Sequence, residues 1–106
     1  MKTLLIDDCR RAVCNYYRIP KDILIGPRRD WPVARKRQMA MVLAREFTSA
    51  STTQIGIQFG GRDHTTVMHA SAKISELEND MVKIFGAMHD LRLALATYRA
   101  QLGSDP

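Results

Sequence analysis

The sequence has few of the features that mark membrane and secreted proteins. Its 106 residues hold only two cysteines, no apolar run long enough to span a bilayer, and no signal-like stretch after Met1 and Lys2. Cys9 and Cys14 lie five residues apart in an expected helix, so their side chains point about 140° apart around its axis, an unsuitable geometry for a disulfide. These absences predict a cytoplasmic protein, with Cys9 as a small core residue and Cys14 partly exposed.

The sequence also lacks the motifs of nucleotide hydrolysis, zinc binding and nucleophilic catalysis. No phosphate loop of the form G-x-x-x-x-G-K-[ST] occurs, and His64 and His69 are five residues apart, whereas a helical zinc site needs a separation of four. No serine or threonine lies in a nucleophile elbow or beside an acid-oriented histidine. We therefore expect no cofactor, no metal and no enzymatic activity.

Positive charge is concentrated in one segment of what the length predicts to be a single domain, residues 1–106. Residues 18–45 carry eight lysines and arginines but only two aspartates, whereas residues 74–106 carry three bases and five acids. Such segregation favours a polyanionic partner, either a nucleic acid or an anionic membrane surface, although a solvated basic helix face would give the same pattern.

Apolar residues recur at helical spacing along the chain, and no strand signal interrupts them, which predicts an all-α fold. We expect a first helix over residues 7–18, stopped by Ile19-Pro20, and one further turn over residues 21–24. A Gly-Pro loop then leads into a second long helix over residues 32–48, with Asp30 as its cap. The expected core includes Tyr16, Tyr17, Ala40, Leu43, Ala44 and Phe47.

Two helices joined by a glycine turn predict a helix-turn-helix at about residues 51–78. The stretch Ser51-Thr52-Thr53-Gln54 matches the S-x-x-Q capping box that opens the first of them, and Gly60-Gly61 ends that helix. Asp63 is placed to cap the second helix. The buried side of that helix should hold Val67, Ala70, Ile74 and Leu77, and its outer side Arg62, Thr65, Thr66, His69 and Lys73.

A long C-terminal helix is expected over about residues 80–102. Its apolar positions follow a near-heptad spacing, which predicts that one side packs on the core. Its length leaves room for a residual apolar face that could contact a protein partner or a second copy of the chain. The predicted apolar stripe consists of Met81, Ile84, Phe85, Met88, Leu91, Leu95, Tyr98 and Leu102.

Residues 59–74 carry a specific signature. They read FGGRDHTTVMHASAKI, which resembles the pattern FGGRDHTTVxHA of the C-terminal DNA-binding domain of DnaA, the bacterial chromosomal replication initiator. The resemblance extends upstream through residues 28–41 and covers residues 5–95. It implies a stand-alone helix-turn-helix domain that binds double-stranded DNA at DnaA-box-like sites of the form TTATNCACA.

The matched positions divide into base contacts and backbone contacts. The resemblance places major-groove base contacts on Asp63, His64, Thr65 and Thr66, and a minor-groove contact on Arg29. The chemistry agrees, because threonine methyl groups suit the thymine methyl and arginine favours the narrow minor groove of A·T-rich DNA. Backbone contacts are expected, from the match or from the basic surface, at Arg28, Arg35, Arg37, Gln38, Arg45, Thr48, Thr52, Thr53, Arg62 and Lys73.

Three segments depart from the family pattern. Asp30-Trp31-Pro32 follows Arg29 where the family has small polar and basic residues, Lys36 replaces a proline, and Thr52-Thr53 replaces a Leu-Pro pair. These changes predict an altered affinity or sequence preference at the minor-groove end. Trp31 either packs on the following helix as a hydrophobic staple or contacts the sugar-phosphate backbone.

Two functions from different classes stay open. The first is a sequence-specific DNA binder that acts as a replication or transcription regulator, or as a competitor of the initiator, without ATPase activity. The alternative is a protein-interaction module that keeps the fold and binds a replication or regulatory protein, or itself, through the C-terminal helix. Arg29, Arg37, Gln38 and the run from Arg62 to Thr66 favour the first, since a purely protein-binding domain has no need of them.

Overall fold

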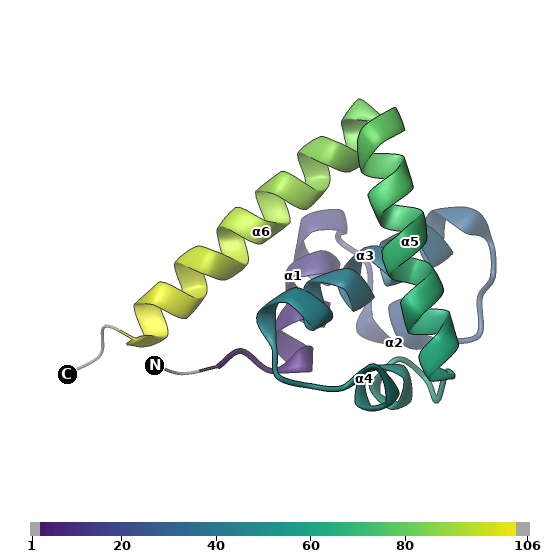
Figure 1. The fold of residues 1–106 in the computed structure, drawn as a ribbon, viewed down its shortest axis with the longest axis horizontal. Helices are drawn as coiled ribbons and strands as arrows, with labels where there is room; N and C mark the ends of the chain where they lie inside the picture. The colour runs from purple at the N-terminus through teal and green to yellow at the C-terminus, as the bar shows by residue number, and fades with distance from the viewer. Residues whose placement is uncertain (1–2, 104–106) are drawn as a thin grey trace.

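The fold consists of helices joined by short loops, as the computed structural model of the chain, which describes residues 3–103, displays in Figure 1. Within that range there is no strand, and the predicted all-α fold with a long C-terminal helix is confirmed. None of the helices in residues 3–103 combines the length and the apolar character needed to cross a bilayer. The helices are α1 (Ile6–Tyr17), α2 (Lys21–Ile25), α3 (Trp31–Phe47), α4 (Thr52–Gln58), α5 (His64–Asp80) and α6 (Val82–Gly103).

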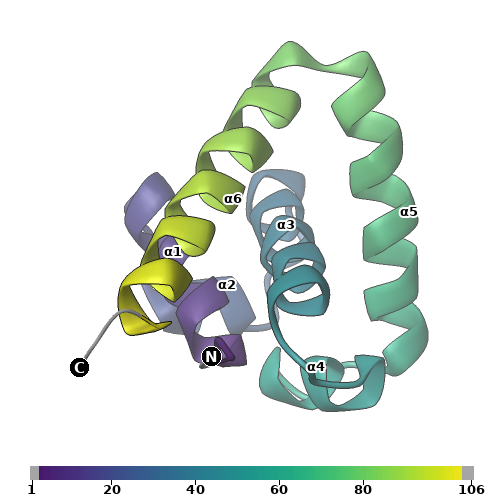
Figure 2. The same cartoon turned by 60° about the vertical axis from the view of Figure 1, so that its left-hand side comes forward.

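Helix α3 lies at the centre, and each of the other helices packs against it. Figure 2 shows it between α5 and α6, with α4 below. The predicted buried residues Ala40, Leu43 and Ala44 are buried, but so are Met39 and Met41 on other sides of the helix. The expected core was therefore incomplete for α3, because a helix that is surrounded by neighbours buries residues all round.

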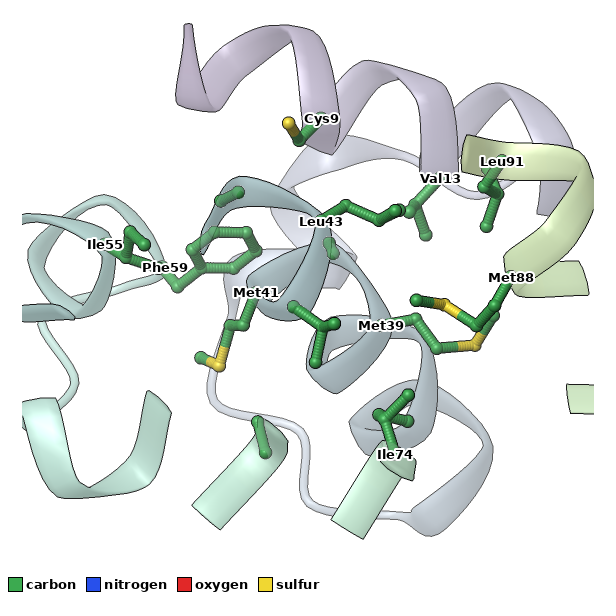
Figure 3. Packing of buried hydrophobic residues seen from close by; sticks show 14 of the residues in the cluster. Cys9, Val13, Met39, Met41, Leu43, Ile55, Phe59, Ile74, Met88 and Leu91 are labelled. Atoms are coloured by element: carbon green, nitrogen blue, oxygen red, sulfur yellow. The ribbon is translucent and has the colours of Figure 1, made fainter. Parts of the chain in front are cut away.

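The core gathers side chains from both ends of the chain around α3 (Figure 3). Phe59 and Ile55 enter from the α4 region, and Met88 enters from α6. Cys9 on α1 is fully buried and Cys14 is partly buried, and both are free thiols, as expected. Burial raises the pKa of the Cys9 thiol to about 12, because the charged thiolate is disfavoured in an apolar surrounding.

Helix α6 packs on the core with one side only. Ile84, Met88, Leu91 and Leu95 of the predicted stripe are buried, whereas Phe85 is 57% exposed. The expected burial of Phe85 and Tyr98 is wrong, because α6 is apolar on most of its circumference and only the side toward α1, α3 and α5 finds partners. The expected burial of Met81 is also wrong, because this residue is the C-cap of α5 and lies in the turn before α6.

Two polar contacts hold α6 in place. The guanidinium group of Arg92 makes paired hydrogen bonds with the carboxylates of Glu46 on α3 and Glu78 on α5, at 2.9–3.0 Å. These two carboxylates raise the pKa of Arg92 above its ordinary value. Tyr16 donates a hydrogen bond to Asp90 at 2.9 Å and is exposed, so its expected core position is wrong, and only Tyr17 packs partly into the core.

Candidate nucleic-acid interface

The turn between α4 and α5 has the geometry of a helix-turn-helix. The Ser51 hydroxyl accepts a hydrogen bond from the Gln54 backbone N–H at 3.1 Å, and the Gln54 side chain accepts one from the Ser51 N–H at 2.8 Å, which confirms the capping box. Gly60 and Gly61 adopt φ values of 81° and 72°, in the left-handed region that favours glycine. Phe59, just before them, is buried, and its ring packs the end of α4 against the core.

Helix α5 begins with a fixed cap. One oxygen of Asp63 accepts hydrogen bonds from the Thr65 backbone N–H at 2.8 Å and from the Thr65 hydroxyl at 2.9 Å, and it lies 3.1 Å from His64 Nδ1. These hydrogen bonds, helped by the nearby His64, lower the pKa of the Asp63 carboxyl. The predicted cap is confirmed, and the orientation of the first turn of α5 is set by its own side chains.

The outward side of α5 is polar in its first two turns. His64, Thr65, Thr66 and His69 are exposed, as expected, and the predicted buried side is confirmed. Met68 is also 51% exposed and lies on the same side. The sequence reasoning missed it, although its position three residues after Thr65 and four after His64 places it there.

The loop before α3, residues 26–30 and hereafter the basic loop, has its backbone turned inward. Arg37 is only 5% exposed, and it donates from Nε to the Leu24 carbonyl at 2.7 Å and from Nη2 to the carbonyls of Gly26 at 3.1 Å and Arg28 at 2.8 Å. Burial lowers the pKa of this guanidinium group. The sequence predicts Arg37 as a contact to DNA phosphates, but its Nε and Nη2 groups are engaged inside the protein.

Arg62 binds the same loop from the other side. Its Nη1 donates to the Ile25 carbonyl at 3.0 Å and to the Phe59 carbonyl, and its Nη2 donates to the Gly26 carbonyl at 2.7 Å. Gly60 lies so close to the end of α2, just before this loop, that a Cβ atom there would collide with the Ile25 carbonyl oxygen. The helix-turn-helix and the basic loop are therefore in direct contact through backbone and arginine groups.

Asp30 does not cap α3 with its side chain, contrary to expectation. It occupies the N-cap position, but its carboxylate accepts two hydrogen bonds from Arg28, one from Nε at 2.8 Å and one from Nη2 at 3.0 Å. This pairing lowers the pKa of the Asp30 carboxyl. A two-pronged arginine pair between neighbouring side chains competes with the cap, so Arg28 is partly neutralised and Arg29 stays exposed without a carboxylate partner among the described residues.

Of the two roles that the sequence left open for Trp31, the hydrophobic staple is not formed. Trp31 is the first residue of α3, is 61% exposed, and carries the Arg35 guanidinium group over its ring at 5.0 Å, a cation–π distance. Arg35 in turn donates to the Gln38 side chain at 2.8 Å. Lys36 points elsewhere, over the Tyr17 ring at 4.9 Å. The departures at positions 31 and 36 thus have different neighbours and only the first lies beside α5.

Basic and polar side chains flank α5 on two sides. On one side, Arg29, Gln38 and Thr66 line a single surface hollow, and a neighbouring hollow is lined by Trp31, Arg35, His69 and Lys73. On the other side, Arg45 donates to the Ser71 hydroxyl at 2.8 Å. The Thr48 hydroxyl donates to the Ala44 carbonyl at the end of α3, and Thr52 and Thr53 form the first turn of α4.

Comparison with known proteins agrees with this geometry. A family model described as the bacterial DnaA helix-turn-helix matches residues 6–74. The chain belongs to the bacterial DnaA helix-turn-helix family. The match covers α1 to α4 and the first two-thirds of α5, which are the elements that carry the basic loop and the exposed polar side chains.

Curated relatives that match this chain include chromosomal replication initiator proteins. The chain is 49% identical over 79 residues to the chromosomal replication initiator protein DnaA of Acinetobacter baylyi, and equally to that of Acinetobacter baumannii. In both cases the match covers 74% of this chain and 17% of the relative. This DnaA-type domain therefore spans about a sixth of the length of the relatives it matches, and membership of the family supports DNA binding.

Proposed function

We propose that this DnaA-type domain binds duplex DNA sequence-specifically at DnaA-box-like sites, and that it acts as a replication or transcription regulator, or as a competitor of the initiator, without enzymatic activity of its own. One observation carries the proposal. Arg29 of the basic loop and Thr66 of α5 line the same hollow, which supports a proposed minor-groove contact and a proposed major-groove contact side by side. A duplex can present both of its grooves to such a pair.

The first two turns of α5 offer suitable groups for a major groove. The methyl groups of Thr65 and Thr66 can contact thymine, and His64 can exchange a hydrogen bond with a base edge. Asp63 can accept from cytosine only with the lone pairs that its cap leaves free. We propose that its first role is to orient Thr65 and His64, and that base contact is the second.

The flanking side chains suit the two phosphate strands that border a major groove. Arg35, Gln38 and Lys73 lie on one side of α5, and Arg45 on the other. Phosphate contacts of this kind set the register of a protein on DNA and make binding depend on salt. Thr48, Thr52 and Thr53 are proposed as additional backbone contacts, and Arg28 as a weaker one because Asp30 shares its charge.

A fluorescence-anisotropy titration tests this function. At one fixed salt concentration, a duplex that contains TTATNCACA should bind about a thousandfold more tightly than a scrambled duplex. With on the order of five arginines and lysines at phosphates or in the minor groove, the log–log salt slope should lie near −4 to −5. Equal binding of the two duplexes would reject sequence-specific recognition, and no binding to either duplex would reject a DNA-binding role. A slope near zero would show that phosphate contacts do not supply the affinity.

A protein-interaction module is the second candidate function, and the outer side of α6 favours it. Val82 is 87% exposed, and Phe85 and Leu93 are also exposed on this helix. Exposed apolar side chains in one row are typical of a contact surface. A negative charge introduced by Leu93→Glu should leave DNA affinity unchanged and weaken any self-association that sedimentation detects. If Leu93→Glu instead weakens DNA binding, α6 belongs to the DNA interface and this candidate fails.

A further inference from the structure

The basic loop has no secondary structure of its own, and its conformation depends on two arginines. The carbonyl groups of Leu24, Ile25, Gly26 and Arg28 all accept hydrogen bonds from Arg37 or Arg62. Carbonyls at the end of a helix such as α2 need partners of this kind, because the helix itself provides none. With the backbone turned inward, the side chains of residues 27–30 point into solvent.

The two arginines connect the loop to different parts of the fold. Arg37 comes from α3, immediately after the loop in the chain. Arg62 comes from the turn before α5, and its bonds to Ile25 and Gly26 span 37 and 36 residues of sequence. Their hydrogen bonds converge on the Gly26 carbonyl, which accepts from both. Among the described residues, Arg62 is the side chain whose hydrogen bonds join the basic loop to the helix-turn-helix.

We infer that Arg62 is a positioning residue: it holds the basic loop at a set distance from α5, so that Arg29 enters the minor groove only when α5 is seated in the major groove. This inference rests on the proposed function and deepens it. It moves Arg62 from the expected phosphate contacts to a role inside the protein. Recognition of the two ends of the DNA site is thereby coupled through the contact between Arg62 and the basic loop.

Lysine cannot replace Arg62 in this role. The guanidinium group reaches three carbonyls with two nitrogens in a fixed plane, whereas an ammonium group is a single donor centre on a flexible stem. Arg62→Lys therefore keeps the charge that DNA attracts and removes the geometry that holds the loop. If this substitution reduces sequence discrimination, the cause is the changed position of the loop and not a lost charge.

The glycine turn supplies an independent test with a matched control. Gly60 and Gly61 are neighbours with similar positive φ values, so alanine is strained in the same way at both. At Gly60 a Cβ would meet the Ile25 carbonyl oxygen and Arg62, whereas at Gly61 there is open space within 4 Å. Gly60→Ala therefore pushes the loop away from α5, and Gly61→Ala reproduces only the backbone strain.

The experiment measures binding of the full chain to four duplexes: the TTATNCACA site, a site with the TTAT end replaced by G·C pairs, a site with the CACA end replaced, and a scrambled site. Arg62→Lys and Gly60→Ala should each lose about tenfold of discrimination at the TTAT end and keep it at the CACA end. Arg29→Ala should lose the same discrimination, and the double variant Arg29→Ala/Arg62→Lys should lose no more than either single variant. Gly61→Ala should keep its discrimination at both the TTAT end and the CACA end.

Arg45→Lys is the control for the replacement of an arginine by a lysine, and it should alter binding to all four duplexes alike. Helical circular dichroism and a thermal melt establish which variants fold, and if Arg62→Lys does not fold, the comparison of Gly60→Ala with Gly61→Ala decides. Retained discrimination at the TTAT end, or an equal loss at both ends, would overturn the positioning role. Failure of the unmodified chain to prefer TTATNCACA would instead overturn the proposed function, which separates the two failures.

Discussion

The first turns of α5 and the outer side of α6 are both exposed, yet they are built from opposite kinds of side chain. On α5, hydroxyl, imidazole and carboxylate groups are oriented by hydrogen bonds, as in the bonds from Thr65 to Asp63. On α6, Val82, Phe85 and Leu93 are apolar and reach into solvent. The contrast teaches that the α5 side is suited to hydrogen bonds, which need a defined geometry. The α6 side is suited to hydrophobic contact, which depends on buried area and has no preferred direction.

The same contrast appears in the arginines of the two regions. Near α5, Arg29 is exposed and Arg35 is partly exposed, while two arginines beneath them hold the basic loop. On α6, Arg92 is bound by two glutamates and offers no free charge outward. The other arginine of α6, Arg99, lies over the Phe47 ring at 5.0 Å, so both arginines of this helix are engaged with side chains of the protein itself.

The largest expected effect is on the stability of the fold beneath each region. Phe59→Ala should lower the free energy of unfolding by about 3–5 kcal/mol, because it empties a fully buried site between α4 and α3. Phe85→Ala should change it by about 0.5 kcal/mol or less, since that ring is exposed. Urea unfolding measures both. A comparable loss at Phe85 would show that the outer side of α6 is a packed surface and would break the comparison.

The next effect concerns recognition. His64→Ala should weaken binding to the TTATNCACA duplex by about 1–3 kcal/mol and barely change binding to random DNA, because the proposed function assigns its imidazole to a base edge. His89→Ala, which removes an exposed histidine from α6, should change neither. Anisotropy titrations on both duplexes provide the measurement. Equal losses on specific and random DNA would mean that α5 does not read sequence.

A smaller effect concerns the charge beside Arg29. Asp30→Ala should tighten binding to all duplexes about two- to fivefold, because a carboxylate near the phosphates is removed. The salt slope should become steeper by about one unit as Arg28 becomes available to a phosphate. Urea unfolding should stay unchanged, since Asp30 makes no side-chain cap. Asp80→Ala, at the far end of α5, is the control, and lost stability with unchanged binding would restore the capping role.

The smallest effect concerns the cap of α5 and its dependence on pH. The folded-state pKa of Asp63 is lowered, so its ionised form contributes stability above the ordinary pKa of about 3.9, and this contribution is lost as pH falls through the folded value. Asp63→Asn keeps a capping side chain and removes the titration. The stability difference between the two proteins should shrink between pH 6 and pH 3, and a constant difference would contradict the assignment.

Signals that depend on neighbours along the chain could be predicted from the sequence. The capping box at Ser51, the Asp63 cap and the buried side of α5 all lie where the spacing placed them, since each involves residues within one or two helical turns. The Asp30 cap was wrong although it is equally local. A cap signal does not show that Arg28, two residues earlier, offers the carboxylate a stronger partner.

Roles that depend on distant partners could not be predicted. In the sequence, Arg37 and Arg62 resemble Arg35 and Arg45, and only the fold reveals that the first two face backbone carbonyls. Periodicity failed for Phe85 for a related reason. A helix that is apolar on most of its circumference has no pattern that selects which side the rest of the protein will cover.

The burial of Cys9 has a consequence for chemistry in solution. With no exposed surface and a pKa raised to about 12, its sulfur presents almost no thiolate to a reagent at neutral pH. A thiol-modifying compound therefore alkylates Cys14 first and reaches Cys9 only after α1 has separated from α3. The rate of the second alkylation reports how often the domain opens, and any duplex that binds only the closed form slows that rate in proportion to its occupancy.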